Sequence, residues 1–509
     1  MPVESLALAL KETAQQRPEH TALVAGDARV SYGELAVAVE RLAAGMMGLG
    51  AEPGDRVALV LPNCPQLVMG YLAAARLGGV AVPLNPLLTP AEAGYILQDS
   101  EARAVIAIEQ TAPLATAAAE MAPSVERLIV SGEERPEDAV DFAALMATKA
   151  AGLPESLGGD DLCALLYTSG TTGRPKGAQL SHENLLFDAR ASAASVQMTP
   201  EDVFLTVLPL FHSFGATVCM LIPLMMGATS VLLPRFESLA VLEALEREDA
   251  TIFPGVPSMF AALAALKTER SFDTSRLRLC ISGGAPLPDP VLHAFEERYQ
   301  ATLLEGYGPT EASPVVSCNR SRDTRKIGGV GPPLEGVDVE IQDDEGAPVP
   351  VGEVGELCVR GRNVMSGYWR DPKQTQEALR DGWLLTGDLA RMDEDGYLYI
   401  VDRKKDLIIV GGLNVYPREV EDVMRQLPQV ADCAVVGISS PLHGERVKAF
   451  VELREGQGLT SEQIVEHCTA QLAHYKVPRA VEFVPELPRS ATGKVLKREL
   501  RERERDAAP

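Results

Sequence analysis

Short apolar runs alternate with helical patterns along most of the first 300 residues. RVALVLP, VAVPLNP and RAVIAI have the composition of buried strands, and CPQLVMGYLAAARLG and AEAGYILQDS between them have helical periodicity. Strands that are apolar on both faces and separated by helices form parallel sheets covered on each side. The alternation resumes after residue 200 with VLEALERE, TIFPGV and LRLCISGG. It therefore predicts an α/β fold with two doubly wound sheets.

Residues 203–234 contain no Asp, Glu, Lys or Arg and are long enough to span a bilayer. Pro209, Pro223 and Gly227 interrupt this stretch, however, and ATSVLL within it has the β-branched character of a short strand. We therefore expect a buried strand, loop, helix and strand, and no transmembrane segment. The N-terminus lacks the basic and apolar regions of a signal peptide.

The residue pattern changes from about residue 331. From there, VDVEIQDDEGAPVP, GELCVRG and GYLYIVDRKKD indicate a β-rich subdomain. A new mixed unit follows the charged segment 402–406, with a helix opened by Pro417, two strands, a second helix over 461–473 and a basic tail. We predict an N-terminal domain over 1–402, with the β-rich subdomain at 331–402. A hinge over 403–406 and a small mobile α+β domain over 407–509 complete the multidomain chain.

The formal net charge of −24 excludes proteins that bind nucleic acid through a broad basic surface. A phosphate ligand must instead be held by local loops and a few placed cations. The eight cysteines are scattered, with no CxxC pair. This pattern favours reduced thiols and a cytoplasmic protein over a disulfide framework or a zinc site.

The segment YTSGTTGRPKG at 167–177 has the composition of a phosphate-binding loop. Glycines let the backbone turn tightly around a ligand, hydroxyls and free N–H groups bind phosphate oxygens, and a lysine adds a positive charge. Its spacing is not GxxxxGK[ST], which disfavours a P-loop NTPase, and a polar turn between strands is the alternative. The candidate ligand-binding residues are Thr168, Ser169, Gly170, Thr171, Thr172, Gly173 and Lys176.

This loop and six later motifs together resemble the acyl-adenylate-forming superfamily, which includes acyl-CoA synthetases, peptide-synthetase adenylation domains and firefly-type luciferases. The later motifs occur in the family's order and are SGGAPL, GYGPTE, GWLLTGDLA, DRKKDLI, GGLNVYP and PRSATGKVLKREL. The resemblance covers nearly the whole chain. It is strongest to medium- and long-chain fatty-acyl-CoA synthetases and to 4-coumarate-CoA ligases.

The resemblance implies a two-step reaction. A carboxylic acid and ATP, with Mg²⁺, give an acyl-AMP and pyrophosphate, and coenzyme A then takes the acyl group. Lys494 resembles the family lysine that bridges the acyl carboxylate and the α-phosphate. Glu311 resembles the magnesium ligand, with Thr168 as a second expected ligand, and Thr310 resembles the residue bonded to the α-phosphate. Glutamate is a hard oxygen donor of the kind that Mg²⁺ requires.

The same resemblance assigns the nucleotide pocket. Tyr307 is expected against the adenine, Asp388 at the ribose hydroxyls and Arg403 near the same sugar. The other residues expected to line the nucleotide are Gly283, Gly284, Ala285, Pro286, Glu305, Gly306 and Gly308.

Other residues are assigned to the acid, the thiol and the lid. His212, in LPLFHSFG, is expected in the acyl pocket or the thioester step, and a buried structural histidine is the alternative. Arg235 matches a position near the CoA phosphates in plant relatives, and Gly411 and Gly412 resemble the turn that lines the pantetheine tunnel. Lys405 resembles the hinge residue of the lid.

The acid is only partly specified. Amino-acid adenylation domains place Asp in an FDxS-like string where this chain has Phe-His-Ser-Phe, so amino acids are disfavoured. Gly308 stands where acetyl-specific relatives place Trp, which implies room for a longer acyl tail. We therefore expect a medium- or long-chain fatty-acyl-CoA synthetase.

Two enzyme alternatives stay open, an aryl-CoA ligase and an acyl-AMP ligase that loads a carrier protein. A catalytically silent nucleotide-binding scaffold is the alternative outside enzymes. The sequence leaves the oligomeric state open, a homodimer included.

Overall fold

The computed structural model describes residues 5–154, 157–169, 174–440, 444–490 and 493–506. The chain divides into two compact units. Unit 1 comprises Met1–Val339 and Val359–Leu384, and unit 2 comprises Glu340–Cys358 and Leu385–Pro509.

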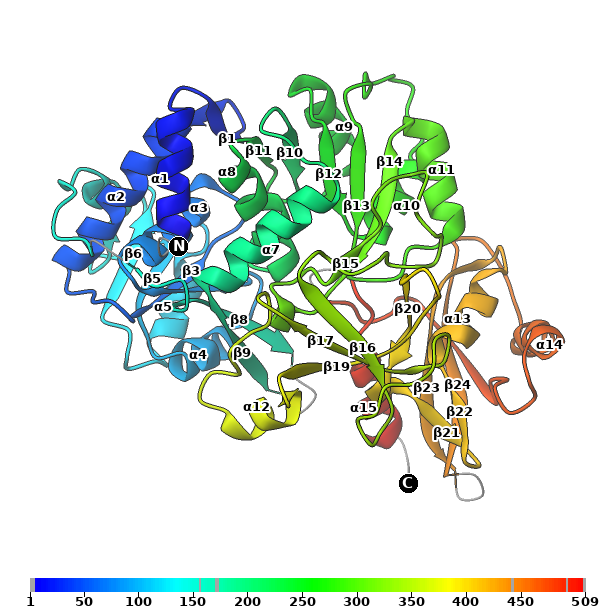
Figure 1. The fold of residues 1–509 in the computed structure, drawn as a ribbon. Coiled ribbons are helices and arrows are strands. Elements are labelled where there is room, and N and C mark those ends of the chain that lie inside the picture. Colours follow the sequence, from blue (N-terminus) through cyan, green and yellow to red (C-terminus); the bar gives the residue numbers. More distant parts are fainter. Residues whose placement is uncertain (1–4, 155–156, 170–173, 441–443, 491–492, 507–509) are drawn as a thin grey trace. The chain divides into compact units, whose positions relative to one another are not determined.

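A seven-stranded sheet of strand order β7-β6-β5-β3-β4-β8-β9 forms the first core of unit 1 (Figure 1). Its pairings are parallel except that of β8 with β9. Helix α3 packs on the face that carries Leu59 and Ile106, whereas α4 and α5 pack against Val60 and Val105 on the opposite face. The helices here are α2 (Tyr32–Gly48), α3 (Pro65–Arg76), α4 (Pro90–Asp99), α5 (Ala112–Ala119) and α6 (Phe142–Met146). The strands are β3 (Arg56–Val60), β4 (Val80–Leu84), β5 (Ala102–Ile108), β6 (Arg127–Ser131), β7 (Val140–Asp141), β8 (Leu162–Ser169) and β9 (Pro175–Ser181).

An eight-stranded sheet of order β15-β14-β13-β12-β10-β11-β1-β2 forms the second core. Its strands are parallel from β14 to β1, and β2 and β15 add antiparallel edges. Two strands thus come from residues 21–31, before the first sheet begins, which the sequence patterns did not indicate. The strands are β1 (Thr21–Ala25), β2 (Ala28–Ser31), β10 (Val203–Thr206), β11 (Thr229–Leu232), β12 (Ile252–Gly255), β13 (Leu279–Ser282), β14 (Thr302–Tyr307) and β15 (Ser317–Cys318).

Helices cover this second sheet as well. Phe253, Phe260 and Phe295 are fully buried in its core and contact one another edge to face, which joins β12 to α10 and α11. Helix α7 lies between the two large sheets in Figure 1 and contacts β9 as well as η1 and α8. The helices here are α1 (Leu6–Gln16), α7 (His182–Ser195), η1 (Gly215–Leu221, a π-helix), α8 (Ile222–Met226), α9 (Ser238–Arg247), α10 (Pro257–Ala265) and α11 (Asp289–Tyr299).

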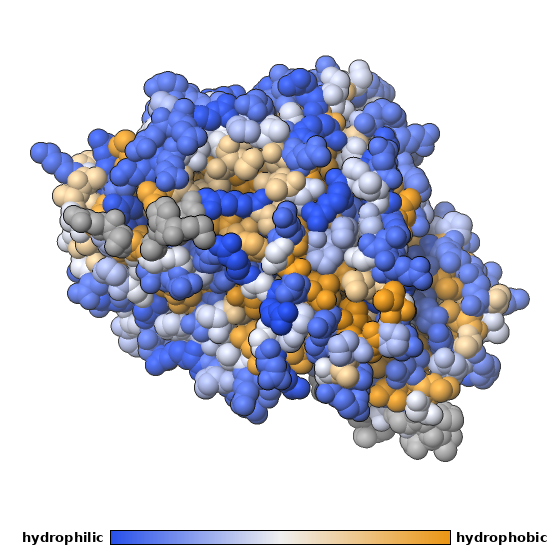
Figure 2. Space-filling model, in the orientation of Figure 1, coloured by the Kyte–Doolittle hydropathy of each residue, from blue (hydrophilic) through white to orange (hydrophobic). Residues whose placement is uncertain are grey.

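The charge-free stretch 203–234 is buried within unit 1. It forms β10, η1, α8 and β11, and most of its residues are buried. The expected strand, helix and strand are confirmed. No helix in the described ranges is both long enough and apolar enough to cross a membrane. Hydrophilic residues cover most of the face shown in Figure 2, with smaller hydrophobic areas among them.

A further five-stranded sheet has the order β16-β17-β19-β18, with β20 paired to β19. This sheet is the expected β-rich subdomain, and the short helix α12 (Pro372–Ala378) precedes β18. The strands are β16 (Val337–Gln342), β17 (Gly355–Gly361), β18 (Leu379–Arg380), β19 (Trp383–Met392) and β20 (Leu398–Arg403).

Unit 2 also contains a five-stranded sheet of order β22-β21-β24-β23 with β25 paired to β24. The expected α+β composition of the C-terminal part is confirmed, and the predicted basic tail contains the helix α15. The strands are β21 (Ile408–Val410), β22 (Leu413–Val415), β23 (Val430–Ser440), β24 (Gly444–Leu453) and β25 (Ala480–Val484). The helices are η3 (Lys404–Asp406, a 3₁₀ turn), α13 (Pro417–Arg425), α14 (Ser461–Gln471) and α15 (Lys497–Asp506).

The compact units divide near residues 339, 358 and 384. The predicted boundary at 402, the hinge over 403–406 and the C-terminal domain over 407–509 therefore stay predictions about motion.

We predict that Tyr32→Phe destabilises unit 1. The buried Tyr32 hydroxyl lies 2.6 Å from the carbonyl oxygen of Ala228 and 3.0 Å from that of Pro223, so it fixes α2 to the end of the charge-free stretch. Removing one partner of a buried hydrogen bond costs about 1–3 kcal/mol. Calorimetric unfolding should show a lower melting temperature. An unchanged transition would mean that this hydroxyl is not buried and paired.

Candidate active site

The loops that follow β10, β12, β13 and β14 leave one edge of the eight-stranded sheet. These strands are parallel, so their carboxyl ends lie together, which is where open α/β sheets bind ligands. His212 lies in the loop after β10, Gly283 follows β13, and Tyr307 ends β14. Three of the segments predicted from the sequence therefore share one edge of one sheet, because the strands before them are largely buried on both faces.

Direct contacts join these loops. The hydroxyl oxygens of Ser213 and Thr310 lie 2.9 Å apart, which links the His212 loop to the segment after β14. A side chain at Gly283 would approach the Phe214 ring to 3.1 Å, so a glycine permits this close contact. Glu305 accepts a hydrogen bond from the backbone N–H of Leu287 at 3.0 Å. The structure thus brings His212, the 283–286 segment and the 305–311 segment together.

His212 is half-buried, and its Nδ1 accepts a hydrogen bond from the backbone N–H of Phe214 at 3.3 Å. Its carbonyl oxygen accepts from Ala216, at the start of the π-helix η1. Single π-helical turns inside helices often occur at functional sites. The geometry places His212 beside the site and leaves its expected role a prediction.

The turn over residues 310–315 carries Thr310 and Glu311 and is held by buried polar groups. Thr217 donates to the carbonyl oxygen of Ser313 at 2.6 Å, and Ser313 donates to that of Asn363 at 2.8 Å. The Asn363 amide donates to the carbonyl oxygens of Ala312 and Val315 at 3.1 and 3.0 Å. This network fixes the backbone on both sides of Glu311.

Asp188, on α7, completes the support of this turn. Its Oδ2 accepts from the backbone N–H of Val315 at 3.2 Å, and the side chain is fully buried. Burial raises the pKa of the Asp188 carboxyl well above its usual range, and the hydrogen bond from the Val315 N–H lowers it only in part. In the described part of the chain, Oδ1 of Asp188 and Oδ1 of Asn363 have no hydrogen-bond donor.

The phosphate-loop candidate is the connection of the antiparallel hairpin β8–β9, in which Thr168 pairs with Lys176. Gly170, Thr171, Thr172 and Gly173 lie outside the described residues. Lys176 hydrogen-bonds Gln374, and its Nζ lies 5.2 Å from the centroid of the Tyr368 ring. The Tyr368 hydroxyl donates to Oε1 of Glu311 at 2.7 Å. The predicted phosphate lysine and the predicted metal ligand therefore contact the same tyrosine.

Glu311 provides a donor that suits Mg²⁺. Its carboxylate is anionic and hard, and Oε2 has no hydrogen-bond donor among the described residues. Mg²⁺ is often held by one or two carboxylates together with substrate phosphates. In the described ranges, no group of three or more His, Cys, Asp or Glu side chains could hold a metal ion. The residues fit an ion that arrives with a nucleotide.

Unit 2 brings a second set of predicted residues together. Asp388 on β19 pairs in register with Arg403 on β20, and Arg403 Nε lies 3.0 Å from Asp388 Oδ1. Lys494 and Lys405 lie within the electrostatic range of this pair. The Lys494 residue is exposed over part of its surface, but neighbouring protein atoms displace water from around its ammonium group. This loss of hydration, followed by the positive charge of Arg403, lowers the pKa of Lys494 to about 8. Burial and the charge of Arg403 also lower the pKa of Lys405.

Two remaining predictions fall on exposed positions. Gly411 and Gly412 form the turn between β21 and β22 with φ values of 58° and 84°, and a side chain at either position would meet open space. These left-handed φ values, rather than a lack of room, explain the glycines here. Arg235 is 83% exposed and lies 3.8 Å from Glu237. Among the described residues, no hydrogen bond or ion pair joins Arg235 to the unit 1 group, or this turn to the Asp388–Arg403 pair.

Gly308 differs from the expectation. A Cβ at this position would lie 1.5 Å from the carbonyl oxygen of Pro314 and 3.0 Å from the backbone nitrogen of Val316. The glycine is therefore required by the close approach of the 310–315 turn. The empty space inferred for a longer acyl tail is not present at this Cβ, and that argument for acyl length fails.

Sequence reasoning missed the polar residues that support the site. Tyr368, Asn363, Asp188 and Ser213 lie outside the charged and glycine-rich segments that signalled chemistry. Ser213 stands inside the quoted string LPLFHSFG, and Tyr368 precedes one of the two tryptophans of the chain. Neither feature specifies a partner, because Tyr368 contacts a residue 57 positions away and Ser213 one 97 positions away.

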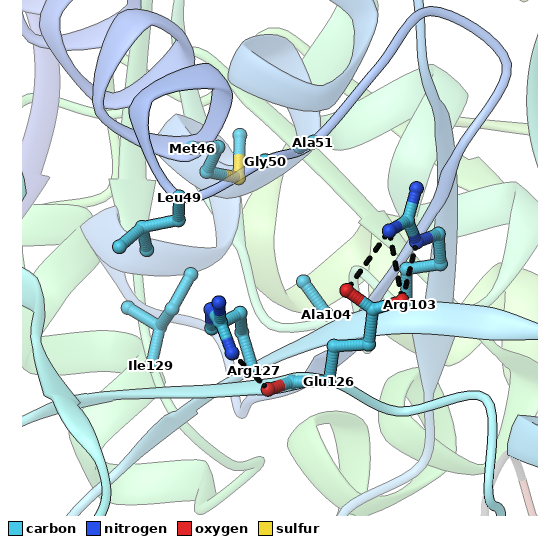
Figure 3. Close-up of a pocket in the computed structure, with 9 residues that line it drawn as sticks. All are labelled: Met46, Leu49, Gly50, Ala51, Arg103, Ala104, Glu126, Arg127 and Ile129. Carbon is cyan, nitrogen blue, oxygen red and sulfur yellow. Dashed lines mark hydrogen bonds and ion pairs between the residues drawn. The ribbon is translucent and has the colours of Figure 1, made fainter.

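A small pocket of about 20 Å³ lies elsewhere in unit 1 (Figure 3). It is lined by Met46, Leu49 and Ile129 on one side and by Arg103, which pairs with Glu126, on the other. Its volume suits about one water molecule. None of the predicted site residues lines it.

The chain matches known families and structures over nearly its full length. The model of the AMP-binding enzyme family matches residues 10–369, and that of the AMP-binding enzyme C-terminal domain matches residues 419–494. A long-chain-fatty-acid–CoA ligase of Bacillus subtilis is 36% identical, over 99% of this chain and 95% of its own. A feruloyl-CoA synthase of Amycolatopsis is 40% identical, over 96% of this chain and 97% of its own.

Solved structures agree with these sequence matches. The crystal structure of an anthranilate CoA ligase in complex with anthranoyl-AMP has a TM-score of 0.92 and 31% identity, and covers 100% of this chain and 98% of its own. ATP-bound MatB from Rhodopseudomonas palustris has a TM-score of 0.91 and 34% identity, with 99% of both chains covered. The expected fold class is confirmed, and the chain belongs to the AMP-binding enzyme family.

We predict that Asp188→Asn stabilises the protein at alkaline pH. The raised pKa means that the folded protein binds a proton that the unfolded chain, with a pKa near about 4, releases. Folded-state stability therefore falls as pH rises above about 4 toward the folded pKa, and an amide removes this loss. Its N–H groups would also supply a donor beside Asn363 Oδ1.

Melting temperatures of both proteins between pH 5.5 and 8.5 check this expectation. The advantage of the variant should grow with pH. A variant that loses most stability at the highest pH would show that Asp188 is ionised and needed as a carboxylate.

Proposed function

We propose that this member of the AMP-binding enzyme family is an AMP-forming acid–CoA ligase that activates a carboxylic acid with ATP and transfers the acyl group to coenzyme A. The observation that carries the proposal is the grouping of Lys176, on β9, with Thr310 and Glu311, which follow β14 at the carboxyl edge of the eight-stranded sheet. These residues supply a cation, a hard carboxylate and a hydroxyl within one hydrogen-bonded neighbourhood. Such a set suits a nucleotide triphosphate and its metal ion.

In the first proposed step, a carboxylate oxygen attacks the α-phosphorus of ATP and pyrophosphate leaves. Negative charge builds on the phosphoryl oxygens, so preorganised donors and cations lower the barrier. Thr310 would donate to the α-phosphate, its own hydroxyl fixed by Ser213. Lys176 and the 168–173 loop would bind the β- and γ-phosphates. A Mg²⁺ ion held by Glu311, with Thr168, would neutralise phosphate charge when bound.

Tyr307, Gly283, Gly284, Ala285 and Pro286 would bind the adenosine, as their positions after β13 and β14 allow. Asp388 and Arg403 would bind the ribose. Lys494 would bridge the acid and the α-phosphate, and a pKa of about 8 leaves it mostly protonated at pH 7. We also propose that the C-terminal domain rotates about Lys405 and so brings Lys494 to the nucleotide.

In the second step, the CoA thiol attacks the acyl carbonyl carbon and AMP leaves. Gly411 and Gly412, Arg235 and His212 are the residues proposed for the thiol path, the CoA phosphates and the acyl pocket. The wide solvent access of Gly411, Gly412 and Arg235 is compatible with a role toward a ligand that arrives from solution.

The first candidate acid is a medium- or long-chain fatty acid, which is the class named for the Bacillus subtilis relative that matches 99% of this chain. The second is an aromatic acid, favoured by the 40% identity to a feruloyl-CoA synthase and by the structural match to a benzoate CoA ligase from Burkholderia xenovorans, with a TM-score of 0.89. The failure of the Gly308 argument removes one reason to prefer the fatty acid.

A panel of acids tests the proposal. AMP release should require an acid, and CoA should raise it and yield a thioester. The panel would contain medium- and long-chain fatty acids, of about 8–18 carbons, together with ferulate and benzoate. The kcat/KM of the fatty acids should exceed that of the two aromatic acids by on the order of 10-fold or more, because a pocket discriminates about 10- to 200-fold per methylene. Faster turnover of aromatic acids would select the second candidate. Acyl-AMP that CoA cannot discharge would point to a carrier-protein ligase, and no AMP with any acid would favour a silent scaffold.

We predict that Lys494→Ala slows acyl-AMP formation by on the order of 10²–10³, the usual cost of one preorganised electrostatic donor. The variant should still convert supplied acyl-AMP and CoA to thioester, because the lysine charge is needed only when the acid meets the α-phosphate. Lys497→Ala is unsuitable as a control since Lys497 pairs with Glu421. The exposed Lys373→Ala is a better control and should leave both half-reactions unchanged. Equal losses in both half-reactions for Lys494→Ala would refute the assignment.

A further inference from the structure

We propose that Tyr368 is a positioning residue that holds Glu311 in the orientation that binds the metal–nucleotide complex and seats Lys176 beside it. The inference rests on the proposed function, because it assigns Glu311 to the metal and Lys176 to phosphate. It concerns a residue that the sequence motifs did not select.

Tyr368 belongs to a strap, residues 361–369, that joins the two phosphate-handling parts of unit 1. On one side, the backbone N–H of Met365 donates to the carbonyl oxygen of Glu311 at 2.9 Å. On the other, the strap exchanges backbone hydrogen bonds with β9, from Trp369 to Gly177 at 2.8 Å and from Gln179 to Gly367 at 2.9 Å. The strap is therefore fixed to both neighbours by its backbone, whatever side chain stands at position 368.

The Tyr368 side chain adds two contacts that differ in chemistry. Its hydroxyl donates to Oε1 of Glu311 at 2.7 Å, which fixes one carboxylate oxygen. Its ring lies under the ammonium of Lys176 at 5.2 Å, within the range of a cation–π interaction. One side chain thus orients the carboxylate through its hydroxyl and the ammonium through its face.

The electrostatics of this arrangement favour a role toward a cation. A hydrogen bond to Oε1 holds the carboxylate plane and leaves Oε2, which has no donor among the described residues, as the oxygen for a metal ion. Partners of metal ligands commonly change metal affinity about 10- to 100-fold when removed.

The turn that carries Glu311 does not depend on this hydroxyl. Its backbone is held by Thr217, Asn363 and the Met365 N–H. Removing the hydroxyl alone should therefore leave the turn in place and free only the rotation of the Glu311 side chain. This separation makes Tyr368→Phe an informative variant, because it keeps the ring against Lys176.

The test measures ATP binding to the full-length protein by isothermal titration calorimetry, once with Mg²⁺ and once with EDTA. For Tyr368→Phe we expect ATP affinity with Mg²⁺ to fall about 10-fold or more, and affinity in EDTA to stay within about 2-fold of wild type. Titration of Mn²⁺ into the ATP-bound protein, followed by electron paramagnetic resonance, should show a matching loss of metal affinity. Tyr368→Leu, which also removes the ring, should weaken binding in EDTA as well.

Tyr299→Phe is the matched control. Its hydroxyl donates to the carbonyl oxygen of Leu263 at 2.9 Å between α10 and α11, far from Glu311 in the hydrogen-bond network, so ATP binding should be unchanged in both buffers. Equal weakening of ATP binding with and without Mg²⁺ in Tyr368→Phe would show a structural role and overturn the proposal. Wild-type affinity in both conditions would overturn it too.

The same measurements distinguish a failure of the Tyr368 inference from a failure of the proposed function. If the wild-type protein bound ATP equally with Mg²⁺ and EDTA, or released no AMP with any acid, the assignment of Glu311 would fail before Tyr368 is considered. If the wild type showed the magnesium dependence and Tyr368→Phe retained it, only the inference about Tyr368 would fail.

Discussion

The arrangement of this molecule depends on strands that are buried on both faces. β10, β12, β13 and β14 are largely buried on both faces, so most polar residues of the site lie at their carboxyl ends or in the loops that follow. Because the strands are parallel, those loops meet at one edge. The residues around His212, Gly283 and Tyr307, distant in sequence, are neighbours for this reason. Burial of the sheet therefore determines where the candidate site residues lie, at the carboxyl ends of its parallel strands.

The second constraint is the burial of the backbone in the 310–315 turn at this edge of the sheet. Its backbone groups need partners there, and Thr217, Asn363 and Asp188 supply them. Such a network keeps Glu311 and Thr310 in place without a ligand, which reduces the reorganisation needed when charge develops on a phosphate. The close approach of this turn also explains why Gly308 carries no side chain.

The sequence could predict features that follow from local pattern and fails where a contact joins distant segments. The buried strand and helix of 203–234 were predictable, because prolines and β-branched residues argue against a membrane helix. The family motifs located Glu311, Asp388 and Lys494 as candidates, and the structure groups the last two in unit 2. Tyr368 and Asp188 could not be found this way, since a tyrosine in GYW and an aspartate on a helix have no local signal for a partner across the fold. β1 and β2 join the second sheet through pairing with β11, which no local periodicity encodes.

The central claim is that the acid attacks the α-phosphorus of ATP to form an acyl-AMP. An acid labelled with ¹⁸O in both carboxylate oxygens tests it directly. The enzyme would be incubated with the labelled acid, ATP and CoA, and the phosphorus products analysed by mass spectrometry. The account predicts one ¹⁸O atom in AMP, because the attacking oxygen stays on the α-phosphorus when the thiol displaces AMP. Label in inorganic phosphate, with unlabelled ADP, would show attack at the γ-phosphorus and would contradict the account.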